Sequence, residues 1–123
     1  MRVLIVDDVA AVREALRLLL SDEPGVEVVG EAADGEEAVR QVEALRPDLV
    51  LMDLDMPHMG GLPAMHAIGR RADPPKLVAM GVYGDSEAVR LNALDAGAAT
   101  FVEKGATLAE VVEALHSAFK STP

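Results

Sequence analysis

The stretch Val3-Leu-Ile-Val-Asp-Asp8 is a run of four aliphatic residues that ends in two carboxylates. Aliphatic runs of this length, without alternating polar residues, are typical of strands buried on both faces of a parallel sheet. Four further runs of this kind follow at residues 26–29, 49–52, 77–80 and 100–102. The sequence therefore predicts five short parallel strands.

Helical patterns occupy the segments between these runs. The first segment has its apolar residues at the spacing of one helix face, typical of a helix that packs on a core: Val12, Ala15, Leu16, Leu19 and Leu20. The second helix begins at the capping residue Asp34 and stops before Pro47. A third is expected at residues 63–71 and a fourth, with a poor apolar face, at 86–96. The last follows a capping box that begins at Thr107.

Five alternating strand and helix units in 123 residues predict an α/β fold, the flavodoxin-like doubly wound (βα)5 arrangement. Its five-stranded parallel sheet would have the strand order 2-1-3-4-5, with helices on both faces. A closed eight-stranded barrel needs about twice this chain length. We expect a single domain over residues 1–120, with residues 121–123 as the start of a tail or linker.

The composition excludes several classes of function. There is no cysteine, so disulfide frameworks and thiolate metal sites are ruled out. The net charge of −10 repels nucleic-acid backbones and anionic lipid. No apolar run approaches the ~20 residues of a membrane helix. We therefore expect a cytoplasmic protein that contacts neither nucleic acid nor membrane directly.

Charged residues follow three of the predicted strands. Asp7 and Asp8 end the first, Asp53 ends the third with Asp55 two residues on, and Lys104 follows the fifth. In the order 2-1-3-4-5 the first and third strands are neighbours, so these acids converge at one edge of the sheet. Clustered carboxylates raise each other's pKa unless a cation neutralises them, and an oxygen-rich cluster suits Mg²⁺. The pattern predicts a magnesium site.

Asp53 is the candidate nucleophile of this cluster. A carboxylate beside a divalent ion can attack phosphorus and form an acyl phosphate, and Asp53 follows an entirely apolar strand. Lys104 is placed to pair with phosphoryl oxygens. Alternatively, each acid only caps a helix or solvates a loop, which is the commoner case for any single residue. The whole set on three strand ends favours phosphoryl chemistry.

Three segments, Val3–Asp8, Asp53–Pro57 and Gly97–Lys104, resemble the motifs of response-regulator receiver domains in two-component signalling. The resemblance extends over essentially the whole chain. Residues 25–38 further resemble the receivers of the NarL/LuxR type, which are joined to a C-terminal helix-turn-helix DNA-binding domain.

This resemblance implies phosphotransfer from a histidine kinase or a phosphotransfer protein to Asp53 as the phosphoacceptor. It implies Mg²⁺ bound by Asp8, Asp53 and the main-chain carbonyl of Asp55, with Asp7 assisting mainly through water. Lys104 would contact the phosphoryl group. Such a domain is not an enzyme beyond its own phosphorylation and dephosphorylation. It either stands alone or is joined to a C-terminal DNA-binding output domain absent from this chain, and the sequence leaves both open.

The end of the strand at residues 77–80 departs from the family. Receivers usually carry a Ser or Thr there, whose hydroxyl binds the phosphoryl group. Here the position falls on Gly81 or, counting back from Lys104, on Val82, and neither has a hydroxyl. Either a glycine amide or water substitutes and Asp53 still accepts phosphate with a weaker or different conformational change, or the domain acts through protein contacts without phosphorylation. We favour the first because the residues for metal and phosphoryl chemistry are retained.

Other expectations concern signalling from the site. Phe101 matches the family's switch aromatic, or it is a plain core residue. Asp55 and Tyr83 are expected to modulate the chemistry. We expect a possible homodimer through the helix at 86–96, the strand at 100–102 and the last helix, because the first of these is weakly anchored.

The main rival function is an aspartate-nucleophile phosphatase. Asp53-Leu-Asp55 mimics the Asp-x-Asp motif of haloacid-dehalogenase-like enzymes, in which the first acid attacks and the second protonates the leaving group. In those enzymes the motif lies on the first strand and is followed by a threonine. Here it lies on the third strand and is followed by Met56 and Pro57, which favours the receiver.

Overall fold

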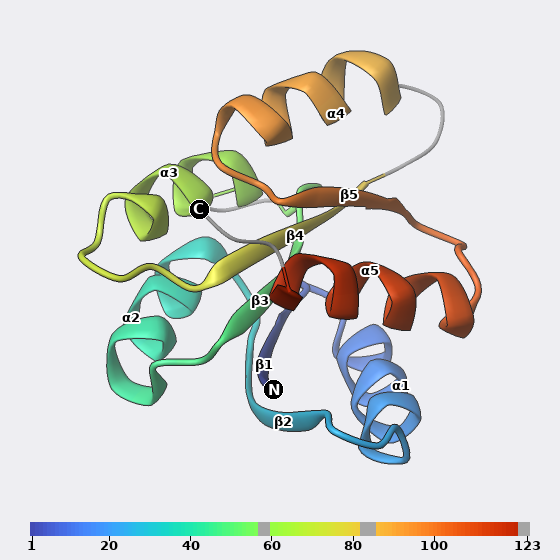
Figure 1. The fold of residues 1–123 in the computed structure, drawn as a ribbon. Helices are drawn as coiled ribbons and strands as arrows, with labels where there is room; N and C mark the ends of the chain where they lie inside the picture. The colour runs from blue at the N-terminus through green and yellow to red at the C-terminus, as the bar shows by residue number, and fades with distance from the viewer. Residues whose placement is uncertain (57–59, 82–85, 121–123) are drawn as a thin grey trace.

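The computed structural model describes residues 1–56, 60–81 and 86–120, which form one parallel sheet flanked by helices (Figure 1). The strands are β1 (Arg2–Val6), β2 (Glu27–Ala32), β3 (Leu49–Asp53), β4 (Lys76–Gly81) and β5 (Thr100–Glu103), in the order β2-β1-β3-β4-β5. The helices are α1 (Ala10–Ser21), α2 (Gly35–Leu45), α3 (Gly61–Gly69), α4 (Ser86–Asp95) and α5 (Leu108–Lys120). The predicted doubly wound fold and its strand order are confirmed.

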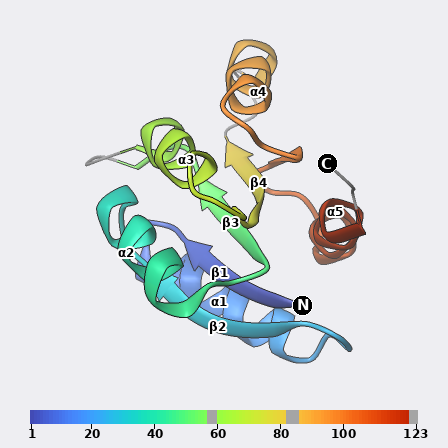
Figure 2. The same cartoon turned by 60° about the vertical axis from the view of Figure 1, so that its left-hand side comes forward.

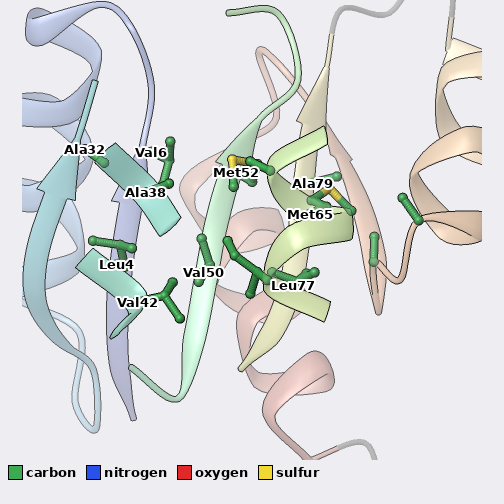
Figure 3. Close-up of a cluster of buried hydrophobic side chains, with 14 of the residues drawn as sticks. Leu4, Val6, Ala32, Ala38, Val42, Val50, Met52, Met65, Leu77 and Ala79 are labelled. Atoms are coloured by element: carbon green, nitrogen blue, oxygen red, sulfur yellow. The ribbon is translucent and has the colours of Figure 1, made fainter. Parts of the chain in front are cut away.

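Side chains of the central strands alternate between two hydrophobic cores. Leu4, Val6 and Val50 lie in the core under α2, α3 and α4 (Figure 3). Val3 and Ile5 point the other way, into the core under α1 and α5. Figure 2 shows how these two sets of helices enclose the sheet. Burial on both faces explains why the central strands are continuous aliphatic runs.

The edge strand β2 extends further than predicted. It runs to Ala32 instead of ending at residue 29, and its last residues pair with Ile5 and Val6 after a register shift. An edge strand is only partly covered, so a polar residue such as Glu31 can continue it. An unbroken aliphatic run therefore underestimates the length of this strand.

The predicted packing face of α1 is confirmed for two of its five residues and wrong for three. Leu20 is buried and Leu16 packs against the core. The other three residues of that face are exposed: Val12, Ala15 and Leu19. Arg13, whose side chain is only 18% exposed, lies toward the strands instead. The reason is that its guanidinium binds groups of β2 and of the turn after β1, as described below.

The helix α4 exposes much of its apolar surface. Ala93 is buried, but Leu91 is 57% exposed and Leu94 is also exposed. The poor apolar face predicted for this helix is confirmed, and its contacts are with β4 and β5 at one end of the sheet (Figure 1). Neither α4 nor any other described helix is long and apolar enough to cross a membrane.

Candidate functional site

Three carboxylates meet at the carboxyl ends of β1 and β3. Val6 pairs with Met52 across these strands, so the next residues, Asp7 and Asp53, are neighbours. Asp7, Asp8 and Asp53 each offer one oxygen, and these oxygens lie within 4.8 Å of one another. Asp7 and Asp53 are buried, whereas Asp8 is exposed. The structure thus brings together three of the acids that the sequence predicted to converge.

The two carboxylate oxygens of Asp53 have different surroundings. Oδ1 lies 2.9 Å from Lys104 Nζ and accepts a hydrogen bond of 2.9 Å from the N–H of Asp55. Oδ2 is buried and has no hydrogen-bond partner among the described residues. An unpaired buried oxygen is costly, so it marks the point at which this site would gain most from a ligand.

The charges of the site shift the pKa values of both partners. Burial raises the pKa of Asp53 above its ordinary 3.8, and the hydrogen bonds from Lys104 and Asp55 do not cancel this effect. Burial alone would lower the pKa of Lys104, but the hydrogen bond and the charge of Asp53 outweigh it, so the pKa of Lys104 is raised. The shift of Asp53 thus comes mainly from shielding from water, and the shift of Lys104 from the hydrogen bond and negative charge of the acids around it.

Lys104 is held at the site by its backbone. Its N–H donates a hydrogen bond of 2.7 Å to the carbonyl of Gly81. The next residue, Gly105, has φ of +96°, a left-handed conformation that favours glycine. Nζ also lies 3.6 Å from Asp55 Oδ2. The turn after β5 therefore directs the only lysine near the cluster, among the described residues, toward Asp53 at the end of β3 and Asp55 just beyond it.

The turn from β1 into α1 is fixed at several points. The N–H of Asp7 donates to the carbonyl of Ala32, and its carboxylate accepts a bond of 2.8 Å from the N–H of Val9. Arg13 donates from its guanidinium to the carbonyl of Asp7 at 2.6 Å and lies 3.3 Å from a carboxylate oxygen of Glu31. The sequence analysis missed Arg13, since helical spacing alone does not distinguish it from its neighbours.

The start of α3 packs directly on the end of β3. A Cβ atom at Gly61 would lie 2.7 Å from the carbonyl oxygen of Asp53 and 2.8 Å from Cα of Leu54. Both contacts are closer than side chains tolerate and both are with backbone, so this approach requires glycine. The backbone that follows Asp53 is therefore closely confined.

Gly81, the last residue of β4, brings no side chain to the site. Asp53 pairs with Met80, so Gly81 lies one residue beyond the partner of Asp53 and is buried. Val82 and Tyr83, the other residues predicted in this region, lie outside the described residues. Within the described part of β4, no hydroxyl stands beside Asp53.

Phe101, on β5, lies at the margin of the core under α2, α3 and α4. It is only partly buried against the core, and the guanidinium of Arg90 lies 5.8 Å from the centre of its ring. Both residues line a groove of about 590 Å³, to which Lys104 and Glu110 also contribute. The predicted switch aromatic therefore borders a surface groove between α4 and α5.

The donors of the acid cluster fit a hard divalent cation. All of them are carboxylate oxygens, the ligand type that Mg²⁺ and Ca²⁺ prefer, and Asp53 Oδ2 has no partner in the part of the chain that the structure describes. Cation binding would also offset the excess negative charge described above. A doubly wound sheet with acids and one lysine at the carboxyl ends of its strands defines an α/β domain with an acidic pocket able to take a cation.

Comparison with known proteins identifies the family. Residues 3–116 match the model of the response regulator receiver domain. The chain is 42% identical over 118 residues to response regulator GacA of Pseudomonas viridiflava, covering 96% of this chain and 55% of GacA. It is 45% identical over 103 residues to a protein-glutamate methylesterase/protein-glutamine glutaminase of Alkalilimnicola ehrlichii, covering 84% of this chain and 26% of that protein.

Solved structures agree. The signal receiver domain of NarL from Mycobacterium tuberculosis superposes with a TM-score of 0.91 at 35% identity, covering 98% of this chain and 97% of that domain. A chain of the CheX-CheY-BeF3-Mg²⁺ complex from Borrelia burgdorferi gives 0.89 at 30% identity, covering 98% and 90%. The chain belongs to the response regulator receiver domain family, and its relatives include regulators of the NarL/LuxR type.

The family assignment limits what the relatives say about this chain. The chain spans about half the length of GacA and about a quarter of the length of the methylesterase. The resemblance to the methylesterase is therefore a resemblance of receiver domains, and the larger part of that protein has no counterpart in this chain. The family thus argues against the rival phosphatase interpretation, which placed the Asp53 motif in a different class of enzyme.

Proposed function

We propose that this chain is a phosphoacceptor that takes a phosphoryl group onto Asp53 from a histidine kinase or a phosphotransfer protein, with Mg²⁺ bound beside it. The observation that carries the proposal is the state of the Asp53 carboxylate. One oxygen is held by Lys104 and the N–H of Asp55, and the other is buried and unpaired. The carboxylate is therefore oriented and yet has a free acceptor.

The chemistry is a transfer between nitrogen and oxygen. A carboxylate oxygen of Asp53 forms the new bond to phosphorus, and the bond from phosphorus to the donor's imidazole nitrogen breaks, leaving the electron pair on that nitrogen. Lys104 Nζ, close to both Asp53 and Asp55, is positioned to bind the transferred phosphoryl oxygens. A bound Mg²⁺ would supply charge stabilisation for those oxygens.

The proposed ligands of Mg²⁺ are Asp8, Asp53 and the main-chain carbonyl of Asp55, with Asp7 acting mainly through water. Asp8 is the exposed member of the cluster, so it can reach an ion that keeps several waters. The carboxylate of Asp7 already accepts the N–H of Val9, which is consistent with an indirect role. The presence of Mg²⁺ in the related CheX-CheY complex supports the choice of ion.

We propose that signalling from the site is atypical. Gly81 offers no hydroxyl to a phosphoryl group, so an amide or a water must serve there. The possible homodimer would form through α4, β5 and α5, where Leu91 is exposed and the groove at Phe101 opens. Asp55 would modulate the chemistry through its carboxylate, 3.6 Å from Lys104. The same modulating role remains a prediction for Tyr83.

The proposal extends to the whole protein. The relatives of the NarL/LuxR type suggest a C-terminal DNA-binding output domain beyond this chain. The net charge of −10 argues that the receiver itself does not bind DNA or an anionic membrane, and it suits a cytoplasmic regulator. The receiver would be no enzyme apart from its own phosphorylation and dephosphorylation.

Phosphorylation can be tested by intact mass. The protein is incubated with MgCl₂ and acetyl phosphate, and we expect a gain of one phosphoryl group that disappears in Asp53→Asn. Asn keeps the shape of Asp and can still accept the N–H of Asp55, so the variant removes the nucleophile and its negative charge while leaving the backbone contact in place. Absence of an adduct from wild-type protein would refute the proposal and favour a receiver that works without phosphorylation. Multiple turnovers of phosphomonoesters would instead reveal a phosphatase.

A further inference from the structure

We infer that Arg13 is a positioning residue for the cation site: it fixes the turn that carries Asp7 and Asp8, while Glu31 offsets its charge. This inference rests on the proposed Mg²⁺ site. It assigns a role to a residue that does not itself offer a ligand and that the sequence pattern did not single out.

The hydrogen bonds of the turn support this role. Arg13 donates from α1 to the carbonyl of Asp7 at 2.6 Å, so the peptide that joins Asp7 to Asp8 is held from the helix side. The other contacts of Asp7, to Ala32 and Val9, hold its N–H and its carboxylate. The carbonyl bond is therefore the contact that fixes the peptide leading to Asp8. Asp8 is exposed, and its direction depends on this peptide.

The burial of Arg13 supports the same role. Its side chain is 18% exposed, whereas exposed Val12 and Leu19 show that α1 turns apolar residues outward. Withdrawing a guanidinium from water is costly unless it is paired. Both of its contacts, the Asp7 carbonyl and the Glu31 carboxylate, lie at the edge of the sheet that carries the acid cluster. The orientation of the helix is thus tied to the cation site.

The charge of Arg13 by itself would oppose cation binding. A guanidinium next to a divalent ion repels it, so a purely electrostatic role predicts that removing Arg13 strengthens Mg²⁺ binding. Glu31, 3.3 Å away on β2, reduces this repulsion. If Arg13 instead fixes the turn, removing it should weaken Mg²⁺ binding, because a loosened Asp8 must then be ordered when the ion binds. The two roles can therefore be separated by the direction of the change.

Arg17 provides a matched control. It carries the same charge on the same helix and pairs with the same Glu31 carboxylate, at 2.6 Å. Its side chain is 44% exposed, and its guanidinium contacts Glu31 and not, among the described residues, the carbonyl of Asp7. Arg13→Gln and Arg17→Gln thus remove equal charge, but only the first removes the bond to the turn.

The experiment measures Mg²⁺ affinity by calorimetric titration of metal-free protein with MgCl₂ at fixed ionic strength. We expect Arg13→Gln to bind roughly tenfold more weakly than wild type, the size typical of residues behind metal ligands. Arg17→Gln should bind as tightly as wild type or slightly more tightly. Amide hydrogen exchange of the metal-free proteins provides a second measurement: the Val9 N–H should exchange faster in Arg13→Gln only.

The outcomes separate the two hypotheses. Equal or tighter Mg²⁺ binding by Arg13→Gln overturns the positioning role, as does equal weakening in both variants. Thermal unfolding of the metal-free variants identifies a general loss of structure, which would lower the melting temperature and speed exchange throughout the sheet. If wild type binds no Mg²⁺, the proposed cation site fails, and faster exchange confined to Val9 and its neighbours still decides whether Arg13 fixes the turn.

Discussion

The two sides of the site differ in how firmly they are held. On one side, which we call the acid side, Asp7, Asp53 and Lys104 have hydrogen bonds to backbone or to each other, and Arg13 ties α1 to them. On the other, the α4 side, Gly81 has no side chain to offer and α4 is largely exposed. The side chains expected to take part in the chemistry are thus held by hydrogen bonds before a ligand binds. Few groups on the α4 side are available to respond to a phosphoryl group on Asp53.

We expect this difference to separate chemistry from signal output. In the proposed function the groups expected to bind a cation and a phosphoryl oxygen are retained, while neither Gly81 nor Val82 carries the hydroxyl usual in the family. Four experiments test how far the two sides are independent.

The largest effect is expected for the packing of the two helices. Leu20→Ala on α1 removes a completely buried side chain and should lower the free energy of unfolding by about 2–5 kcal/mol. Leu91→Ala on α4, at a position 57% exposed, should change it by no more than about 0.5 kcal/mol. Urea denaturation measures both, and similar losses in the two variants would show that α4 is anchored as firmly as α1.

Next in size is the effect of the lysine on phosphoryl uptake. Lys104→Met removes the charge beside Asp53 and should slow phosphorylation by acetyl phosphate by roughly 10²-fold, the usual effect of losing one stabilising donor. Arg90→Met on the α4 side also removes one positive charge, but near Phe101, and should leave the rate unchanged. The time course of intact mass gives both rates. A slow Arg90→Met variant would contradict the separation of the two sides.

A smaller effect concerns pH. Because the folded-state pKa of Asp53 is raised above 3.8, the folded protein binds this proton more tightly than the unfolded chain does. Wild-type stability should therefore fall, relative to Asp53→Asn, as the pH rises from the ordinary carboxyl value through the raised one. Urea denaturation of both metal-free proteins at several pH values measures this difference. Saturating MgCl₂ should reduce it, and a pH-independent difference would contradict the raised pKa.

The smallest effect is expected on the α4 side. Gly81→Thr, or Val82→Thr if that residue occupies the switch position, should strengthen the coupling between phosphorylation and self-association, by roughly fivefold or more in the association constant. Sedimentation with and without Mg²⁺ and acetyl phosphate measures the coupling. If neither hydroxyl changes the phosphorylation-dependent shift in association, the missing hydroxyl does not explain the atypical pattern.

The sequence was sufficient for the central strands and for the site acids because both depend on strong local patterns. A buried parallel strand must be aliphatic, and Asp7, Asp8 and Asp53 follow such strands directly. The predicted strand order placed the ends of β1 and β3 side by side, and with them the three acids. Lys104 could be predicted at the site for the same reason, since it directly follows β5.

The orientation of α1 and the end of β2 could not be predicted in this way. Val12 and Arg13 are adjacent on α1. Arg13 is the one that turns inward, because its guanidinium forms an ion pair with Glu31 on β2. Glu31 in turn belongs to an edge strand, where the requirement for aliphatic residues is relaxed. These features result from tertiary contacts between polar groups, for which local periodicity carries no signal.

The contact at Gly61 has a mechanical consequence. The backbone of Asp53 and Leu54 and the Leu54 side chain all approach Gly61 closely, so the chain just after Asp53 has little room to move toward α3. A phosphoryl group on Asp53 would therefore meet close backbone packing on the α3 side, whereas α4 exposes Leu91 and Leu94 to solvent. We expect any displacement caused by that group to be larger at α4 than at the start of α3.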